Sequence, residues 1–86
     1  MAQKALYIEW EDSCSVGSRV WTDKEDVTRK GPSLCHSVGF VLKETKDFIA
    51  LAGHLVGESG DCSGNMVIPR SAVRRLRRLS LPVRRK

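Results

Sequence analysis

The sequence predicts an all-β protein, a small and highly curved antiparallel barrel of four to five short strands. Apolar and polar residues alternate over several short segments, as they do in half-buried strands. Turn-forming residues separate these segments, and a chain of 86 residues has room for only one small core. A barrel suits such a chain, because a sheet that closes on itself leaves no unpaired edge strand.

The central element is a β-hairpin predicted from residues 35 to 55. The polar segment 44–47 forms its turn, between an alternating strand and a second apolar strand at 48–52. An isolated hairpin is marginally stable in water, so other segments must cover its apolar face. The candidates are the segments 5–10 and 65–68.

Alternation also predicts which side chains share a face. One face of the hairpin carries three apolar residues, Val38, Phe40 and Leu42. The segment 5–10 directs a second set to one side, Leu6, Ile8 and Trp10. We expect both sets to be buried, and we expect Tyr7, on the opposite face, to be exposed.

The segment 18–33 predicts an early loop that contains a short helix, because long unstructured loops are uncommon in small domains. Thr22 and Glu25 have the spacing of a capping box, which marks a helix start. Trp21 stands alone before this polar stretch. Two alternatives are open for it: it folds back over one end of the core, or it is exposed.

The glycine-rich segment 56–64 predicts a surface loop, and 65–68 a further central strand. Pro69 ends that strand because it has no N–H to donate. Beyond it, three apolar residues recur at every third position, Val73, Leu76 and Leu79. This spacing fits a helix or a 3₁₀ turn that runs into a short edge strand, and it leaves the choice between helix and strand open.

Positive charge is concentrated at the C-terminal end of a chain whose net charge is +5. Residues 1–69 hold seven Lys and Arg against ten Asp and Glu, a balance of −3, whereas residues 70–86 hold eight basic residues and no acid, a balance of +8. We divide the chain into one barrel domain, residues 1–79, and a basic tail, residues 80–86. The asymmetry indicates an anionic partner.

The candidate binding residues are the basic side chains of this end: Arg70, Arg74, Arg75, Arg77, Arg78, Arg84, Arg85 and Lys86. Guanidinium groups make paired hydrogen bonds to phosphate oxygens and release counterions from nucleic acid. The sequence has no recognition-helix or zinc-finger pattern, so we expect binding that tolerates any base sequence. A solvated charged face lying against the acidic body, or an acidic protein partner, explains the same residues.

The sequence predicts neither an enzyme nor a cofactor. Its three cysteines and two histidines have no spacing that would orient a pair of zinc ligands. Cys35 and His36 are adjacent on a predicted strand and point to opposite faces, which prevents them from acting as a nucleophile–base pair. Cysteines that are odd in number and widely spaced indicate free thiols in a reducing, cytoplasmic compartment. The first residues contain no unbroken apolar run, so we expect neither a secretory signal nor a membrane span.

Three stretches resemble a group of small proteins encoded by tailed phages and prophages, mostly of unassigned function. They are IEWEDS at 8–13, CHSVGFVLKETKDFIALA at 35–52 and MVIPRSAVRRLRRL at 66–79. The resemblance implies an SH3-like or Sm-like barrel, with a 3₁₀ turn at 69–73 and a closing strand at 74–79. It marks no active site, and it implies the cytoplasm of a host cell as the location.

Taken together, these features predict a non-enzymatic binding module that contacts nucleic acid through its arginine-rich C-terminal segment. The alternative is a protein-interaction module that modulates a host or phage protein through a barrel edge or the loop 57–64. Either function is compatible with oligomers formed through edge strands, and neither requires a membrane partner.

Overall fold

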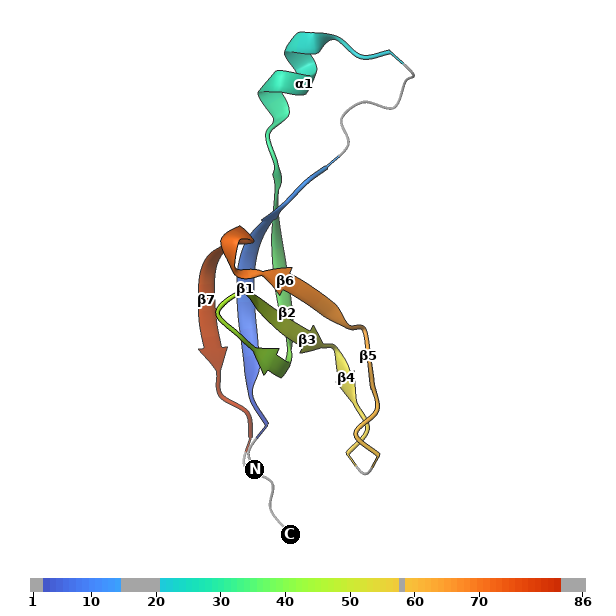
Figure 1. Ribbon diagram of the computed structural model, residues 1–86, viewed down its shortest axis with the longest axis vertical. Coiled ribbons are helices and arrows are strands. Elements are labelled where there is room, and N and C mark those ends of the chain that lie inside the picture. Colours follow the sequence, from blue (N-terminus) through green and yellow to red (C-terminus); the bar gives the residue numbers. More distant parts are fainter. Residues whose placement is uncertain (1–2, 15–20, 58, 83–86) are drawn as a thin grey trace.

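A five-stranded antiparallel sheet forms the body of the protein (Figure 1). The computed structural model describes residues 3–14, 21–57 and 59–82. The strands of the sheet are β1 (Ala5–Asp12), β2 (Ser33–Glu44), β3 (Phe48–Ala52), β6 (Met66–Pro69) and β7 (Val73–Leu79), and a 3₁₀ helix, η1 (Arg70–Ala72), connects β6 to β7. The predicted all-β antiparallel fold is thus confirmed in its main features.

The strands follow one another across the sheet in the order β6-β3-β2-β1-β7. The segment 65–68, predicted as a central strand, therefore lies at an edge. Within the described part of the chain, β6 and β7 form the two edges and do not pair with each other, so the sheet is curved but not closed. Pro69 ends β6 and η1 follows at once, as the sequence predicted.

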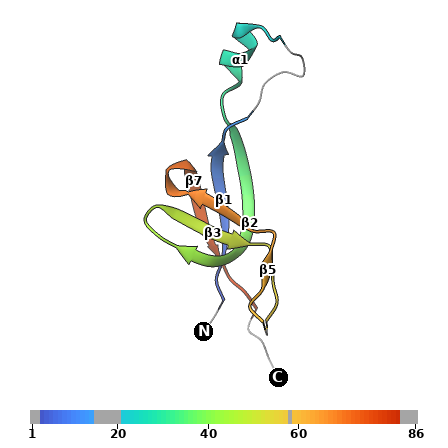
Figure 2. The ribbon, with the colours of Figure 1, turned by 45° about the vertical axis from the view of Figure 1, so that its right-hand side comes forward.

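Two smaller elements lie outside this sheet. The strands β4 (His54–Leu55) and β5 (Cys62–Ser63) form a two-stranded hairpin beyond the end of β3. Part of the predicted surface loop is therefore paired. The predicted short helix is present as α1 (Lys24–Lys30), at the far end of an arm that β1 and β2 form where they extend beyond the sheet (Figure 2).

The core lies on one face of the sheet, which we call the inner face; the opposite face is the outer face. Five apolar side chains are almost fully buried there: Leu6, Ile8, Ile49, Leu51 and Ile68. Each contributes roughly 1.5–3 kcal/mol by leaving water. Trp10 packs against this cluster, and its indole N–H donates to the hydroxyl of Ser37 at 3.0 Å. The predicted core face of β1 is therefore confirmed.

The predicted burial of the apolar residues of β2 is wrong for Val38 and Leu42, which are exposed, Val38 to 65%. Pairing with β1 explains the exposure, because Val38 lies opposite Tyr7 on the outer face. Its neighbour Gly39 lies opposite Leu6 and faces inward. At this position β2 has a glycine that faces the core, and β3 passes close to the backbone there.

The strand β7 settles the choice between helix and strand. A register shift against β1 makes Arg74 an extra residue, a β-bulge, between Val73 and Arg75. The bulge resets the alternation, so that Val73 and Leu76 both pack against the core although they are three positions apart. The three-residue spacing of Val73 and Leu76, which also fits a helix, results here from a β-bulge in a strand.

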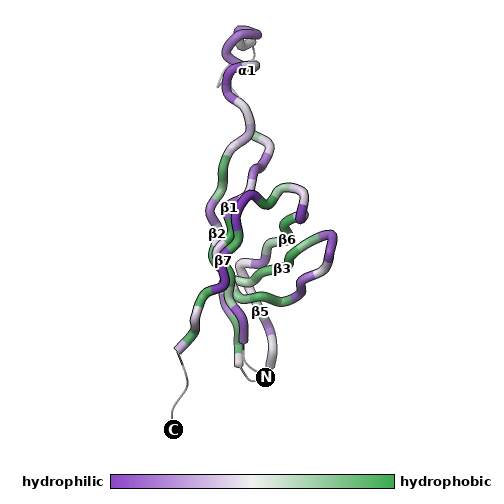
Figure 3. The backbone as a smooth tube through the Cα atoms, turned by 90° about the vertical axis from the view of Figure 1, so that its left-hand side faces the viewer, coloured by the Kyte–Doolittle hydropathy of each residue, from purple (hydrophilic) through white to green (hydrophobic). Residues whose placement is uncertain are grey.

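The arm differs from the predicted early loop. Trp21 is 88% exposed and does not fold over the core. The reason is that β1 and β2 stay paired as far as Asp12 and Ser33, which carries α1 away from the body. No residue of α1 is buried, and Asp23, not Thr22, is its N-cap, so the predicted capping box does not form. The helix is hydrophilic over most of its length (Figure 3).

Candidate nucleic-acid interface

The arginines of the C-terminal strand separate onto the two faces of the sheet. The register with β1 places Arg78 opposite Leu6, on the inner face. It places Arg77 opposite Tyr7 and Arg75 opposite Glu9, on the outer face. Side chains that were equivalent in the sequence therefore have different surroundings.

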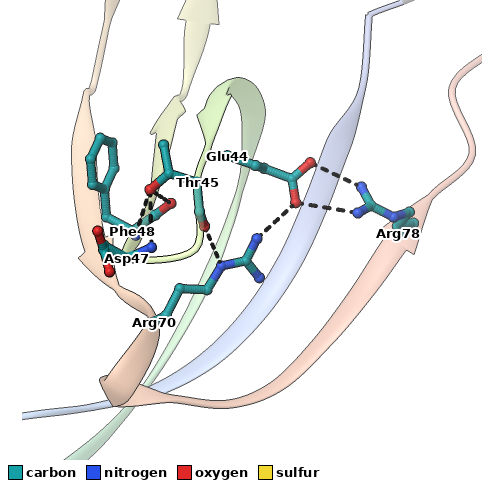
Figure 4. Close-up of polar contacts among 6 residues, drawn as sticks. All are labelled: Glu44, Thr45, Asp47, Phe48, Arg70 and Arg78. Atoms are coloured by element: carbon teal, nitrogen blue, oxygen red, sulfur yellow. Dashed lines mark hydrogen bonds and ion pairs between the residues drawn. The ribbon is translucent and has the colours of Figure 1, made fainter.

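On the inner face, the carboxylate of Glu44 lies between two guanidinium groups (Figure 4). Arg78 donates two hydrogen bonds to it, at 3.3 and 3.2 Å. Arg70 donates a third at 3.5 Å, and its Nε–H donates to the carbonyl oxygen of Thr45 at 2.9 Å. The side chain of Glu44 is only 19% exposed. These contacts join the end of β2 to η1 and β7, neither of which pairs with β2.

The turn between β2 and β3 supports this arrangement. The hydroxyl oxygen of Thr45 accepts hydrogen bonds from the backbone N–H groups of Asp47 and Phe48, at 3.1 and 3.0 Å. The carbonyl oxygen of Asp47 in turn accepts the backbone N–H of Arg70 at 2.8 Å. The polar turn that the sequence predicted is confirmed, and η1 docks against it.

Electrostatics keep Glu44 ionised. The hydrogen bond from Arg78 lowers the pKa of the Glu44 carboxyl below its ordinary value. The positive charges of Arg78, Arg70 and Lys4 lower it further, and partial burial opposes them. Glu44 therefore stays negative and neutralises charge on Arg70 and Arg78, two of the arginines that the sequence offered to an anionic partner.

On the outer face, Arg74 has a close acidic partner, whereas Arg75 has only a distant one. Arg74, at the bulge, reaches Glu11 at 2.7 Å. Arg75 approaches Glu9 only to 4.0 Å, and 55% of its side chain is exposed. Arg77 makes no ion pair with any residue in the ranges 3–14, 21–57 and 59–82. The outer face therefore offers guanidinium groups to a ligand.

Beside these arginines, Tyr7 and His36 form a stacked pair. Their ring centroids are 6.1 Å apart, and the planes are inclined by 20°. The Tyr7 hydroxyl donates to Glu9 Oε2 at 2.7 Å and lies 2.8 Å from Nδ1 of His36. The hydrogen bond to Glu9 raises the pKa of Tyr7 above its ordinary value, so the hydroxyl stays neutral. The sequence predicted that Tyr7 is exposed, but it is half-buried, and the sequence did not place the exposed His36 beside it.

The remaining candidate residues, Arg84, Arg85 and Lys86, lie outside the described residues. The structure has free thiols at Cys14, Cys35 and Cys62. In the part of the chain that the structure describes, no three His, Cys, Asp or Glu side chains come close enough to hold a metal ion. No helix of that part is long and apolar enough to cross a membrane.

Comparisons with known proteins add no further assignment. No protein-family model matches the chain, and neither the curated proteins nor the solved structures gave a match.

Proposed function

We propose that the protein is a non-enzymatic module that binds nucleic acid without sequence preference, through the outer face of β7 and the basic residues that follow it. One observation carries the proposal. Arg70 and Arg78 are committed to Glu44, whereas Arg77 has no acidic partner in the described residues and Arg75 has only a distant one. Fewer of the basic residues can therefore bind a ligand than the sequence suggests, because Arg70 and Arg78 are already paired with Glu44.

Charge on this strand favours a phosphate ligand. Arginine matches the geometry of phosphate oxygens with paired donors, and the contact releases counterions from the nucleic acid. Arg74 also has an acidic partner, Glu11, so the proposed phosphate contacts are Arg75 and Arg77 together with three basic residues beyond the described part of the chain: Arg84, Arg85 and Lys86. If all five contact phosphates, the log of the affinity for duplex DNA should fall against the log of the salt concentration with a slope of roughly −4 to −5.

We also propose a small-barrel architecture for the sheet and a phage-related setting for the protein. The strand order β6-β3-β2-β1-β7, with a 3₁₀ turn before the last strand, supports an SH3-like or Sm-like small barrel. In that barrel, the contacts of Glu44 with Arg70 and Arg78 would replace the backbone hydrogen bonds that the edge strands β6 and β7 do not make with each other. The resemblance to small phage proteins supports a phage-related setting in the cytoplasm of a host cell.

The test is a fluorescence-anisotropy titration of the whole chain with labelled oligonucleotides at about 50 and 200 mM salt. We expect binding at the lower concentration that weakens steeply at the higher one. The double variant Arg75→Gln/Arg77→Gln should bind less tightly. Its salt slope should be smaller by about 1.4–1.8, because two phosphate contacts are lost.

The double variant Lys24→Gln/Lys30→Gln is the matched control. It removes the same amount of charge from α1, far from β7 on the arm. We expect it to bind almost as the natural chain does. No binding at low salt, or an equal loss in both double variants, would contradict the proposal.

A protein partner is the second candidate, and the edge strand β6 favours it. Val67 on this strand is 64% exposed, and its neighbour Met66 is also exposed. An unpaired edge that carries apolar side chains can add a strand from another chain. This candidate predicts that oligonucleotides do not bind even at low salt, which the same titration measures.

A further inference from the structure

We infer that the preferred ligand of this face is single-stranded nucleic acid, with a base stacked against Tyr7 and His36 while Arg75 and Arg77 hold the phosphates. The inference rests on the proposed function and narrows its ligand. It depends on an arrangement that only the strand register creates: two guanidinium groups beside a pair of rings on a partly exposed sheet face.

The register sets the distances. Tyr7 lies between Arg77 on β7 and Val38 on β2, its partners on either side. Glu9 lies in the same way between Arg75 and His36. Neighbouring strands are about 4.8 Å apart, and residues two apart on one strand are separated by about 6.8 Å. Both guanidinium groups can therefore reach phosphates of a strand whose base lies on the rings.

Contacts of the hydroxyl group fix the position of the Tyr7 ring. The Tyr7 hydroxyl reaches Glu9, two residues further along the same face, so the ring lies along β1 and does not stand away from it. The contact with His36 fixes it from the side of β2. Tyr7 is half-buried, whereas His36 and Val38 beside it are exposed, so the platform that the rings of Tyr7 and His36 form is partly open to solvent. The platform is held in place before a ligand arrives, which lowers the entropic cost of binding.

Glu9 is the one acidic side chain within this platform, and it does not preclude an anionic ligand. Its carboxylate accepts the hydrogen bond of Tyr7 at 2.7 Å and lies 4.0 Å from Arg75. Its side chain is about one-fifth exposed. Arg77 adds a positive charge that has no carboxylate partner in the described residues. The local charge thus favours phosphate.

The platform distinguishes single strands from duplexes. In a duplex the bases stack on one another, so their faces are closed to a protein ring, whereas a single strand presents them. The face of a sheet of several strands also cannot enter a groove, as a helix or a two-stranded ribbon does. The arm is such a ribbon, but its tip, residues 21–30, has three basic and three acidic residues, which gives no attraction for phosphate. Charge alone would favour the duplex because it has the higher charge density, so stacking must reverse that order.

The experiment compares a labelled oligothymidine strand with the duplex that the same strand forms with oligoadenine, at low salt. We expect the natural chain to bind the single strand about five-fold more tightly or better, which corresponds to one stacked base. Tyr7→Val, which keeps a residue that favours strands, should lose about five-fold or more for the single strand and little for the duplex. Tyr7→Phe keeps the ring but loses the hydroxyl contacts with Glu9 and His36 that hold it, so it should lose less affinity for the single strand than Tyr7→Val does.

A second measurement needs no variant. Tyr7 is the only tyrosine of the chain, so its ring proton signals can be assigned in an NMR spectrum. Stacking of a base should shift these signals upfield when the single strand is added, and the duplex should leave them in place. His36→Thr should reduce the shift and the affinity together.

The results distinguish a failure of base stacking from a failure of nucleic-acid binding as a whole. If duplex and single strand bind equally, or the duplex binds better, and Tyr7→Val changes neither, then binding is purely electrostatic. That result overturns the stacked base and leaves nucleic-acid binding intact. If neither form binds at low salt, nucleic-acid binding itself fails, and the protein-partner candidate takes its place.

Discussion

On the inner face of β7, Arg78 shares the carboxylate of Glu44 with Arg70, whereas on the outer face Arg75 and Arg77 extend from the same strand with little or no acidic partner. The residue type is the same, and the positions are at most three apart. What differs is the face, which strand pairing and the bulge at Arg74 determine. Composition alone therefore overestimates how many basic residues a ligand can use.

The two faces also differ in packing. The inner face is filled by aliphatic side chains, and β3 crosses it so closely that Gly39 has no room for a side chain. The outer face carries Val38 and His36, which are exposed, and Tyr7, which is half-buried beside them. We therefore expect substitutions on the inner face to change stability and substitutions on the outer face to change binding.

The largest expected effect on stability is that of Gly39→Ala. A Cβ at this position would lie 3.0 Å from the carbonyl oxygen of Ala52 and 3.0 Å from Cβ of Leu51, so β3 would have to move. Overpacking of this kind costs about 1–3 kcal/mol, and the lower entropy of the unfolded chain offsets part of it. We expect a net loss of about 1–2 kcal/mol in urea unfolding.

Val38→Ala, one residue away on the outer face, is the control for this substitution. It should change the free energy of unfolding by no more than about 0.5 kcal/mol, because the side chain is already mostly in water. Equal effects of the two substitutions would contradict the distinction between the faces.

The next effect is that of Glu44→Gln. The change removes the charge that holds Arg78 and Arg70 and keeps the size of the side chain. Because both arginines are partly exposed, we expect a loss of about 1 kcal/mol, and not the larger value typical of buried pairs. Thermal unfolding should show a melting temperature lower by about 4–8 °C.

Glu11→Gln disrupts the exposed pair with Arg74 and serves as the comparison. We expect it to cost about 0.3 kcal/mol. If it destabilises the protein as much as Glu44→Gln does, the contacts of Glu44 have no special role in holding the sheet together.

A smaller effect follows from pH. The pKa of Glu44 is lowered in the folded protein, first by the hydrogen bond from Arg78. The stability it provides is therefore fully present above the ordinary value of 4.5 and is lost as the pH falls through the lower, folded value. The difference in unfolding free energy between the natural chain and Glu44→Gln should be constant from about pH 7 to pH 5 and shrink below about pH 4. A difference that stays constant or grows in acid would show that the charge of Glu44 does not act in this way.

Much of the inner face could be predicted from the sequence. The alternation in 5–10 and the apolar run at 48–52 identified strands whose buried residues are Leu6, Ile8 and Ile49. Such patterns are reliable because burial imposes a period of two on a strand with one face in the core.

The outer face could not be predicted in the same way, because it depends on which strands pair and in what register. The pattern of β2 alone indicated that Val38 is buried, but pairing with β1 puts it outside. The bulge at Arg74 shifts the alternation of β7, so the sequence could not show that Arg75 and Arg77 share a face with Tyr7. The contact between Tyr7 and His36 spans 29 positions of the chain and has no local signal.

The smallest expected effect is that of a substitution on the outer face, Glu9→Gln. Glu9→Gln removes the acidic charge between Arg75 and His36 and leaves a carbonyl oxygen that can still accept the Tyr7 hydroxyl. If this face binds phosphate, the affinity for oligothymidine at low salt should rise about two- to three-fold, since a like charge is lost and Arg75 is released. Stability should change by less than about 0.5 kcal/mol, because the ion pair with Arg75 is long and exposed.

The same change at Glu44 should lower stability without raising affinity. If Glu9→Gln changes only the affinity and Glu44→Gln changes only the stability, the outer face serves ligand binding and the inner face serves folding. A fall in affinity for Glu9→Gln would mean that Glu9 orients Tyr7 more than its charge repels the strand.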